Sequence, residues 1–211
     1  MSHVAVLIPA AGAARRMRGR DKLLEQIDGV PLLVRVVMRA CAVTTDVIVT
    51  LPKGAHPRHR CLEGHSLSVV EVTDPSEGMA ASIRAGITAL PHPCEGVMIL
   101  PADMPDLTQQ DLAMMLETFR AHNQTMICRA ANQDGIAGHP VIFPSVFFEA
   151  LGGLTGDQGG RAILRENAHR LIKVTLPRDH ALTDLDSPEA WQAWRSQRRG
   201  KSKIWTLKHR L

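Results

Sequence analysis

Residues 9–24 read PAAGAARRMRGRDKLL, and they follow a near-continuous apolar run, HVAVLIP, at residues 3–9. An apolar run of this length that ends in small residues is typical of a parallel strand buried on both faces. A helix is predicted next, at residues 31–43, because Pro31 stands at its start and its apolar residues recur at helical spacing. The chain therefore opens with a strand, a glycine- and arginine-rich loop and a helix.

The rest of the chain continues this alternation of short aliphatic runs and helical patterns. Strands are predicted at residues 46–52, 67–72, 96–102, 125–131, 138–143 and 169–176, and helices at residues 78–90, 107–122, 144–151 and 161–168. Thr108 with Asp111 three residues on, and Ser187 followed by Pro188, are typical helix starts. The alternation predicts an α/β fold with three layers: a mostly parallel, doubly wound sheet, helices on both faces, and ligands beyond the carboxyl ends of the strands.

Length and composition limit the classes of protein. A chain of 211 residues that is 45% apolar can build one domain with a sizeable core. Aromatic residues make up only 3%, with no Tyr, which argues against the stacking platforms of single-stranded nucleic-acid binders. Nucleic acid is therefore not an expected partner. No apolar run approaches the roughly 20 residues needed to cross a bilayer, so a membrane is not an expected partner either. The four cysteines show no CxxC spacing and the opening residues lack an export signal, so a cytoplasmic location is expected.

Positive charge is concentrated at the carboxyl end of the chain. The formal net charge is +4, but residues 195–211 hold seven Lys or Arg and no acid, which leaves 18 basic and 21 acidic side chains in residues 1–194. We therefore expect a main domain at residues 1–194 and a basic tail at residues 195–211. Such a charge run is either solvated or docks on a partner, and both interpretations stay open.

The loop after the first strand is rich in small residues and cations. Its small residues let backbone amides approach phosphate oxygens; they are Ala10, Ala11, Gly12 and Ala13. Arg16 and Lys22 add the positive charge that a triphosphate needs during transfer. The loop contains neither a Walker A pattern nor GxGxxG, so it is not expected to bind nucleotides as a P-loop or dinucleotide fold does. An arginine-rich surface loop is the alternative.

Acidic residues follow two of the predicted strands. Asp103 stands at the carboxyl end of the strand at 96–102, where a carboxylate is well placed for Mg²⁺. Asp184 and Asp186 follow the last predicted strand, and alternation along an extended segment points both side chains the same way. Either residue can complete a metal site with Asp103. The alternatives are a turn role for Asp103 and a favourable contact with the following helix dipole for Asp186.

Another segment, HPRHRCLEGH at residues 56–65, offers His and Cys side chains that superficially resemble metal ligands. Their spacing fits no common zinc pattern. We therefore expect a loop or a frayed helix here rather than a metal site.

Six segments lie in order between residues 9 and 191 and read PAAGAARRMRGRDKLL, GMAASIRAG, LPADMPDLT, GHPVIF, GDQGGRAIL and TDLDSPEAW. Together they resemble the molybdenum cofactor cytidylyltransferase family, a group within the molybdenum cofactor nucleotidyltransferase-like (NTP transferase) proteins. Each is weak to moderate alone, but their order over nearly the whole chain is specific. The resemblance implies a nucleotidyltransferase domain at residues 1–194, with a nucleoside triphosphate over the first loop.

The resemblance also implies roles for individual residues. Arg16, Lys22 and Asp103 match catalytic positions, and Asp103 and Asp186 match the acidic positions that hold Mg²⁺. Nucleotide contacts fall on Ala10, Ala11, Gly12, Ala13, Arg16, Lys22, Gly78, Met79 and Ser82. Contacts to the acceptor fall on His139, Asp157 and Arg161, with a packed histidine as the alternative for His139. The chain departs from the common pattern at Arg18 and Gly19, where the family has a single Gly, and this leaves the register of the loop open.

The implied reaction transfers CMP from CTP to the terminal phosphate of the molybdenum cofactor (molybdopterin) and releases pyrophosphate. Ala11 favours CTP, because relatives that use GTP carry a second Gly at this position. The alternatives are GTP as the donor, or a sugar or polyol phosphate as the acceptor. A different class of function is a chaperone that binds the molybdenum cofactor and hands it to a molybdoenzyme. Retention of all four charged positions argues against lost catalysis. The two roles can coexist, and the basic tail is then a candidate docking element for a recipient molybdoenzyme.

Overall fold

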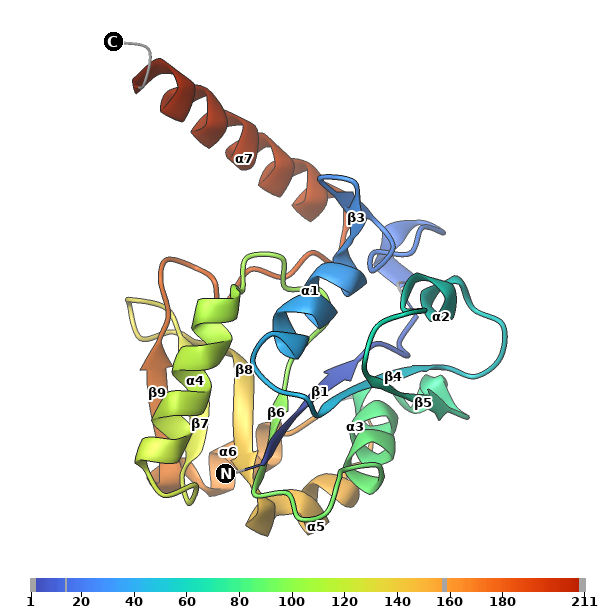
Figure 1. Ribbon diagram of the computed structural model, residues 1–211, viewed down its shortest axis with the longest axis vertical. Coiled ribbons are helices and arrows are strands. Elements are labelled where there is room, and N and C mark those ends of the chain that lie inside the picture. Colours follow the sequence, from blue (N-terminus) through green and yellow to red (C-terminus); the bar gives the residue numbers. More distant parts are fainter. Residues whose placement is uncertain (1–2, 14, 157–158, 209–211) are drawn as a thin grey trace.

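The computed structural model describes residues 3–13, 15–156 and 159–208, which form a seven-stranded sheet between two layers of helices (Figure 1). The strands of this sheet are β1 (Val4–Pro9), β4 (Val47–Pro52), β5 (Ser68–Val72), β6 (Gly96–Ile99), β7 (Ile127–Ala131), β8 (Ala137–Pro144) and β9 (Leu171–Thr175). Their order across the sheet is β5-β4-β1-β6-β8-β7-β9. Strand β8 runs antiparallel to both its neighbours, whereas the other hydrogen-bonded pairs in this sheet are parallel. The predicted α/β fold with a mostly parallel sheet is confirmed.

Helices cover both faces of the sheet. The α-helices are α1 (Leu32–Cys41), α2 (Pro57–Cys61), α3 (Met79–Thr88), α4 (Gln109–Ala121), α5 (Phe148–Gly152), α6 (Arg161–Glu166) and α7 (Pro188–Lys208), and the 3-10 turns are η1 (Arg15–Met17), η2 (Pro75–Glu77), η3 (Ser145–Phe147) and η4 (Ala168–Arg170). One core cluster joins α1, α4 and the first turns of α7 to the sheet, and includes Leu33, Met115 and Trp191. The other joins α3, η3 and α6 to the opposite face, and includes Ile83 and Phe147.

The first strand is the centre of this arrangement because its side chains are apolar on both faces. Val4, Val6 and Ile8 belong to one core cluster and Leu7 to the other, as expected for a parallel strand buried on both sides. Helix α3 lies so close to β1 that a Cβ on Gly86 would stand 2.2 Å from Leu7 Cδ1. A larger residue at this helix position would force the buried Leu7 side chain to move.

The helix starts predicted at residues 108 and 187 are confirmed. Thr108 accepts a hydrogen bond from the Asp111 amide while the Asp111 carboxylate accepts one from the Thr108 amide, which forms a capping box. The Ser187 hydroxyl accepts a hydrogen bond from the Ala190 amide at the start of α7. These local contacts satisfy amides that the first turn of a helix otherwise leaves without an acceptor.

Helix α7 begins against the body of the protein and then extends away from it (Figure 1). Trp194 Nε1 donates to Asp106 Oδ1 at 2.9 Å, and Arg195 Nη2 donates to Glu25 Oε2 at 2.9 Å. Arg198 Nη2 donates to Asp28 Oδ2 at 2.9 Å. The helix continues to Lys208, so the domain boundary expected between residues 194 and 195 falls within it.

Two local features differ from the sequence expectations or were not foreseen. Residues 26–31 form a small antiparallel ladder of β2 (Gln26–Ile27) and β3 (Val30–Pro31) just before α1. The segment at 57–61 is a short ordered helix, α2, which begins at Pro57 after the capping residue His56. No helix in the described part of the chain combines the length and the apolar content needed to cross a membrane.

Candidate functional site

The strand order reverses between β1 and β6. From β1 the chain moves outward through β4 to β5, and then returns to the other side of β1 to form β6. In open α/β sheets, ligands bind in the crevice beyond the carboxyl ends of the strands at such a reversal. The loop after β1 and the segment that carries Asp103 after β6 both lie at this point.

The predicted catalytic residues Lys22 and Asp103 meet there. Lys22 Nζ lies 2.5 Å from Asp103 Oδ2, and the two side chains are only 21% and 19% exposed. Lys22 comes from the loop after β1, and Asp103 from the segment after β6. The strand reversal therefore brings together two residues that are 81 positions apart in sequence.

The second predicted pair, Arg16 and Asp186, also forms an ion pair. Asp186 reaches this place because the Leu185 amide donates to the Asp103 carbonyl at 3.0 Å, which fixes the segment before α7 beside Asp103. Arg16 is largely exposed, at 75%, whereas Asp186 is 28% exposed. Arg16 and Lys22 are thus each neutralised by one carboxylate of the site.

The carboxylates gather enough negative charge to affect one another. Burial raises the pKa of Asp184 above its ordinary value, and the charges of Asp103 and Asp186 raise it further. Among the residues that the structure describes, no three His, Cys, Asp or Glu side chains are grouped so as to hold a metal ion unaided. Mg²⁺ is commonly bound by one or two carboxylates together with substrate phosphates and water. Asp103 and Asp186 fit that donor set, so a metal site here would be completed by the nucleotide.

The small residues of the first loop lie beside these pairs. Ala10 and Ala11 are buried, whereas Gly12 and Ala13 are exposed. The Ala10 amide donates to the Thr50 carbonyl at 2.9 Å, which continues the pairing of β1 with β4. Within the described part of the chain, the amides of Ala11 and Ala13 have no acceptor. Amides left free in this way are able to bind phosphate oxygens, as predicted for this loop.

A buried arginine that the sequence did not indicate, Arg58, binds carbonyl groups of the first loop. Arg58 is 2% exposed and stands on α2. Its guanidinium pairs with the Asp21 carboxylate through two hydrogen bonds of 2.7 and 2.8 Å, and also binds the carbonyls of Ala10 and Gly12. The sequence predicts a loop or a frayed helix at residues 56–65, and nothing in it indicates the contact of Arg58 with the first loop. Arg58 lies on the helix that follows β4, the strand next to β1.

The segment at 78–82, predicted to contact the nucleotide, begins α3. Gly78 has a positive φ of 76° as the residue before the helix, and Met79 is 42% exposed. Ser82 is only 2% exposed, so its side chain packs inside the fold. The loop before α6 lies against this helix start, because the Ala80 amide donates to the Gly156 carbonyl at 3.4 Å.

The residues predicted to bind the acceptor come from different elements. His139 lies on β8 and Arg161 at the start of α6, whereas Asp157 lies outside the described residues. Burial lowers the pKa of His139, and the charges of Arg129 and Arg161 lower it further. The charge of Asp103 offsets part of this effect. The buried Nδ1 of His139 has no hydrogen-bond partner among the described residues. His139 is therefore a neutral imidazole with one nitrogen free, close to two arginines.

Arg129 is a further cation that the sequence analysis did not single out. It is paired in register with Val141 on β8, so these two side chains point to the same face of the sheet. His139 lies two residues before Val141, where the ladder between β7 and β8 shifts its register. Its guanidinium donates to the carbonyls of Gly138 and Ala137. Burial lowers the pKa of Arg129, and the charge of Arg161 lowers it further.

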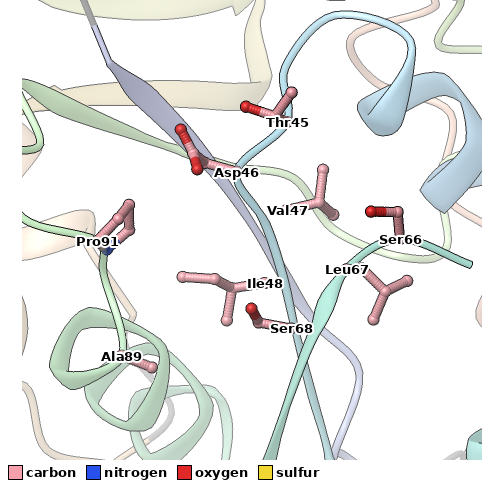
Figure 2. A pocket seen from close by; sticks show the side chains of 9 residues that line it. All are labelled: Thr45, Asp46, Val47, Ile48, Ser66, Leu67, Ser68, Ala89 and Pro91. Carbon is pink, nitrogen blue, oxygen red and sulfur yellow. The ribbon is translucent and has the colours of Figure 1, made fainter.

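A surface hollow lies at the other end of the sheet, as Figure 2 shows. It has a volume of about 260 Å³ and lies at the amino ends of β4 and β5. Its lining residues are Thr45, Asp46, Val47, Ile48, Ser66, Leu67, Ser68, Ala89 and Pro91. Asp46 is the charged residue in this set, and it is 3.2 Å from His3. None of the predicted site residues lines this hollow.

A family model described as the MobA-like NTP transferase domain matches residues 6–171. The chain belongs to this family. The match begins in β1 and includes the loop after it, Lys22 and Asp103. As a MobA-like NTP transferase, the chain is a nucleotidyltransferase.

Two relatives align over most of the chain. The molybdenum cofactor guanylyltransferase of Pseudomonas paraeruginosa (strain DSM 24068 / PA7) is 28% identical over 189 residues, which cover 87% of this chain and 90% of that protein. The purine catabolism protein PucB of Bacillus subtilis (strain 168) is 26% identical over 86% of this chain and 91% of that protein. This MobA-like chain thus resembles relatives with different names, and one of them is named for transfer of a guanylyl group.

Solved structures share the fold. Rv0371c from Mycobacterium tuberculosis H37Rv superposes with a TM-score of 0.80 at 23% identity, over 92% of this chain and 97% of that chain. Its complex with manganese gives a TM-score of 0.76 at 22% identity, over 91% and 97%. CMP:2-keto-3-deoxy-manno-octonic acid synthetase complexed with CTP gives 0.72 at 14% identity, over 95% and 100%. At these identities the likeness concerns the fold, which the MobA-like family shares with these proteins.

Proposed function

We propose that the chain transfers the CMP unit of CTP to the terminal phosphate of the molybdenum cofactor and releases pyrophosphate. The observation that carries the proposal is the meeting of Lys22 with Asp103, and of Arg16 with Asp186, at the strand reversal beside a loop with free amides. Cations for a triphosphate and carboxylates for a metal are the two charge types that nucleotidyl transfer needs. The relative named as a molybdenum cofactor guanylyltransferase supports the acceptor.

The chemistry requires little acid–base work from the protein. A phosphate monoester is already largely anionic at pH 7, so the attacking oxygen needs no general base. The difficulty is to bring two polyanions together and to stabilise the charge that develops on the α-phosphate and on pyrophosphate. In this proposal Lys22 stabilises the α-phosphate and Arg16 holds the leaving pyrophosphate. Asp103 and Asp186 would hold Mg²⁺, which would supply Lewis-acid polarisation of the phosphates.

In this proposal the nucleotide competes with the carboxylates for both cations. Its phosphate oxygens replace Asp103 on Lys22 and Asp186 on Arg16. The carboxylates freed in this exchange become available to the metal at the same moment. The proposal therefore predicts that nucleotide and divalent metal bind cooperatively.

The acceptor is expected beyond β8, where Arg129, His139 and Arg161 affect one another electrostatically. A terminal phosphate suits this group, because two guanidinium groups and a neutral imidazole offer hydrogen bonds to an anion. Lowering of the His139 pKa keeps its ring neutral at pH 7. A sugar or polyol phosphate would satisfy the same groups, so it is the alternative acceptor.

Ala11 is the residue that favours CTP over GTP in this proposal. It is 2% exposed and packs with Val72 and Ala81 at the end of β5 and the start of α3. A methyl group at this position takes space next to the helix start at Met79, where the base is expected, and a pyrimidine needs less room than a purine. The relative named as a guanylyltransferase keeps GTP as the alternative donor.

A role as a carrier of the molybdenum cofactor for a molybdoenzyme is compatible with the enzyme reaction. Removal of residues 199–211 leaves the contacts of Trp194, Arg195 and Arg198 in place. If the distal part of α7 is the docking element, this truncation spares turnover and slows transfer of the product to a recipient apoenzyme. An equal rate of transfer would exclude that docking role.

The test of the proposal is a thermal shift of the purified protein with CTP, GTP, ATP and UTP, each with and without Mg²⁺. A ligand that binds only the folded protein raises its apparent stability. We expect the largest shift with CTP and Mg²⁺, and a relative gain for GTP in Ala11→Gly. Asp46→Asn, at the opposite end of the sheet, is the matched control for loss of a carboxylate. A shift for GTP alone would assign the chain to guanylyl transfer, and no shift with any nucleotide would refute the proposed reaction.

A further inference from the structure

The buried guanidinium of Arg58 has no part in the reaction proposed above. Only 2% of the residue is exposed, although burying a charge is costly unless it is paired and hydrogen-bonded. Arg58 stands on α2, a helix of five residues that contacts the first loop through this side chain. A residue type that is rarely buried therefore occupies a position directly behind the first loop.

Arg58 holds the loop at both of its ends. Its Nη1 donates to the Ala10 carbonyl at 2.5 Å and to the Gly12 carbonyl at 3.0 Å, where the chain leaves β1. Its Nε and Nη2 donate to the two oxygens of Asp21, the residue directly before Lys22. One guanidinium group thus connects the start of the loop, at Ala10 and Gly12, to its end at Asp21.

This contact decides which way the peptide groups of the loop face. A trans peptide is planar, so its carbonyl and its amide point in opposite directions. Because the carbonyls of Ala10 and Gly12 point toward Arg58, the amides of Ala11 and Ala13 point away from it. These are the two amides that have no acceptor in the described part of the chain.

The ion pair with Asp21 also affects Lys22. Asp21 Oδ1 accepts a hydrogen bond from the Leu23 amide at 3.0 Å in addition to its contact with Arg58, so the backbone on both sides of Lys22 is fixed. Pairing also neutralises a carboxylate that would otherwise stand beside a triphosphate. Arg58 therefore acts on both the direction of the amides and the placement of the lysine.

We propose that Arg58 is a positioning residue that holds the first loop, through Asp21 and the carbonyls of Ala10 and Gly12, in the form that binds the triphosphate. The inference rests on the proposed function for the identity of the ligand, but the ordering of the loop is a property of the chain without any ligand. Arg58 touches neither the nucleotide nor the acceptor in this scheme.

The experiment compares Arg58→Met, Arg58→Lys and Asp21→Asn with wild type and with Arg60→Met. Arg60 lies on the same helix with an exposed side chain, so it is the matched control for loss of a guanidinium. Hydrogen exchange of backbone amides, followed by mass spectrometry without ligand, measures the order of residues 10–24. Calorimetric titration with CTP and with GTP, in the presence of MgCl2, measures binding of the nucleotide.

We expect Arg58→Met to speed exchange across residues 10–24 and to weaken nucleotide binding by tenfold or more. Arg58→Lys should restore part of both, because it keeps the charge but cannot reach the carboxylate and both carbonyls at once. If Arg58→Met does not fold, Arg58→Lys and Asp21→Asn carry the test. Exchange and affinity within twofold of wild type in these variants would overturn the inference.

Failure of the proposed function has a different signature. If wild type binds neither CTP nor GTP, the proposed reaction fails, while the exchange of residues 10–24 still decides whether Arg58 orders the loop. A purely structural role would lower the melting temperature of Arg58→Lys without any change in nucleotide affinity of the folded protein. That outcome would also contradict a positioning role.

Discussion

Replacing Asp103 by Asn should change nucleotide binding in opposite directions with and without a divalent metal. In wild type, the Asp103 carboxylate competes with phosphate for Lys22, to which it is paired at 2.5 Å. The neutral amide of Asp103→Asn cannot form that ion pair, so Lys22 becomes free to bind the triphosphate. With a metal present, the same substitution removes one of its two protein ligands.

The size of the metal-free effect follows from the burial of the pair. Both side chains are about four-fifths buried, so the pair lies between an exposed ion pair, worth roughly 0.2–1 kcal/mol, and a charged hydrogen bond, worth roughly 1.5–3 kcal/mol. A net value of about 1–2 kcal/mol corresponds to about 5- to 30-fold tighter binding of CTP in EDTA. In Mg²⁺ we expect this gain to vanish or reverse, and turnover to fall by orders of magnitude.

Calorimetric titration with CTP, in EDTA and then in MgCl2, measures both effects on the same protein. Asp46→Asn removes a carboxylate far from the strand reversal and should leave both affinities unchanged. Thermal unfolding of Asp103→Asn first establishes that the variant is folded. Weaker binding than wild type in EDTA would refute the competition between Asp103 and phosphate, and near-normal turnover of the folded variant would refute the metal assignment.

Three further predictions concern other parts of the site. Lys22→Ala should lower kcat, and a steady-state assay that finds only the nucleotide KM changed would contradict its role in the chemical step. The pKa of His139 is lower in the folded chain than in the unfolded chain. Below about pH 6.5 the unfolded chain takes up a proton that the folded chain excludes, so the free energy of unfolding falls as the pH falls. His139→Gln should therefore lose less stability than wild type between pH 7 and 5 in thermal unfolding, and parallel curves would exclude this effect. In Gly138→Ala a Cβ would stand 1.9 Å from the Ala181 carbonyl oxygen. We therefore expect the free energy of unfolding to fall by about 2–3 kcal/mol, which lowers the melting temperature by roughly 5–10 °C. An unchanged melting temperature would contradict this close packing.

Local chemistry made much of the fold predictable from the sequence. Thr108 with Asp111 and Ser187 with Pro188 determine where two helices begin through contacts within four residues, and the structure has both starts. The buried run before Pro9 required a strand with apolar side chains on both faces. The direction of β8 was not predictable in the same way, because alternating burial along a strand is the same whether it runs parallel or antiparallel to its neighbours.

The site was predictable only where the strand order alone brings residues together. Lys22 and Asp103 each follow a strand at the reversal, so their meeting follows from the parallel sheet. Arg58 depends instead on how α2 is placed behind the first loop, and no periodicity encodes that placement. The approach of Asp184 and Asp186 to Asp103 likewise depends on the hydrogen bond from the Leu185 amide to the Asp103 carbonyl, which joins two distant segments.

The last helix has a mechanical consequence for the site. Arg195 and Arg198 bind Glu25 and Asp28, which lie three and six residues after Lys22, while the rest of α7 extends outward to Lys208. An α-helix is stiff and rises about 1.5 Å per residue, so the outer part is an arm of about 15–20 Å. Trp191 and Trp194 fix the inner end of the helix in the core, so the arm can act as a lever. A force on its far end would act on the segment that carries Lys22, the proposed catalytic lysine.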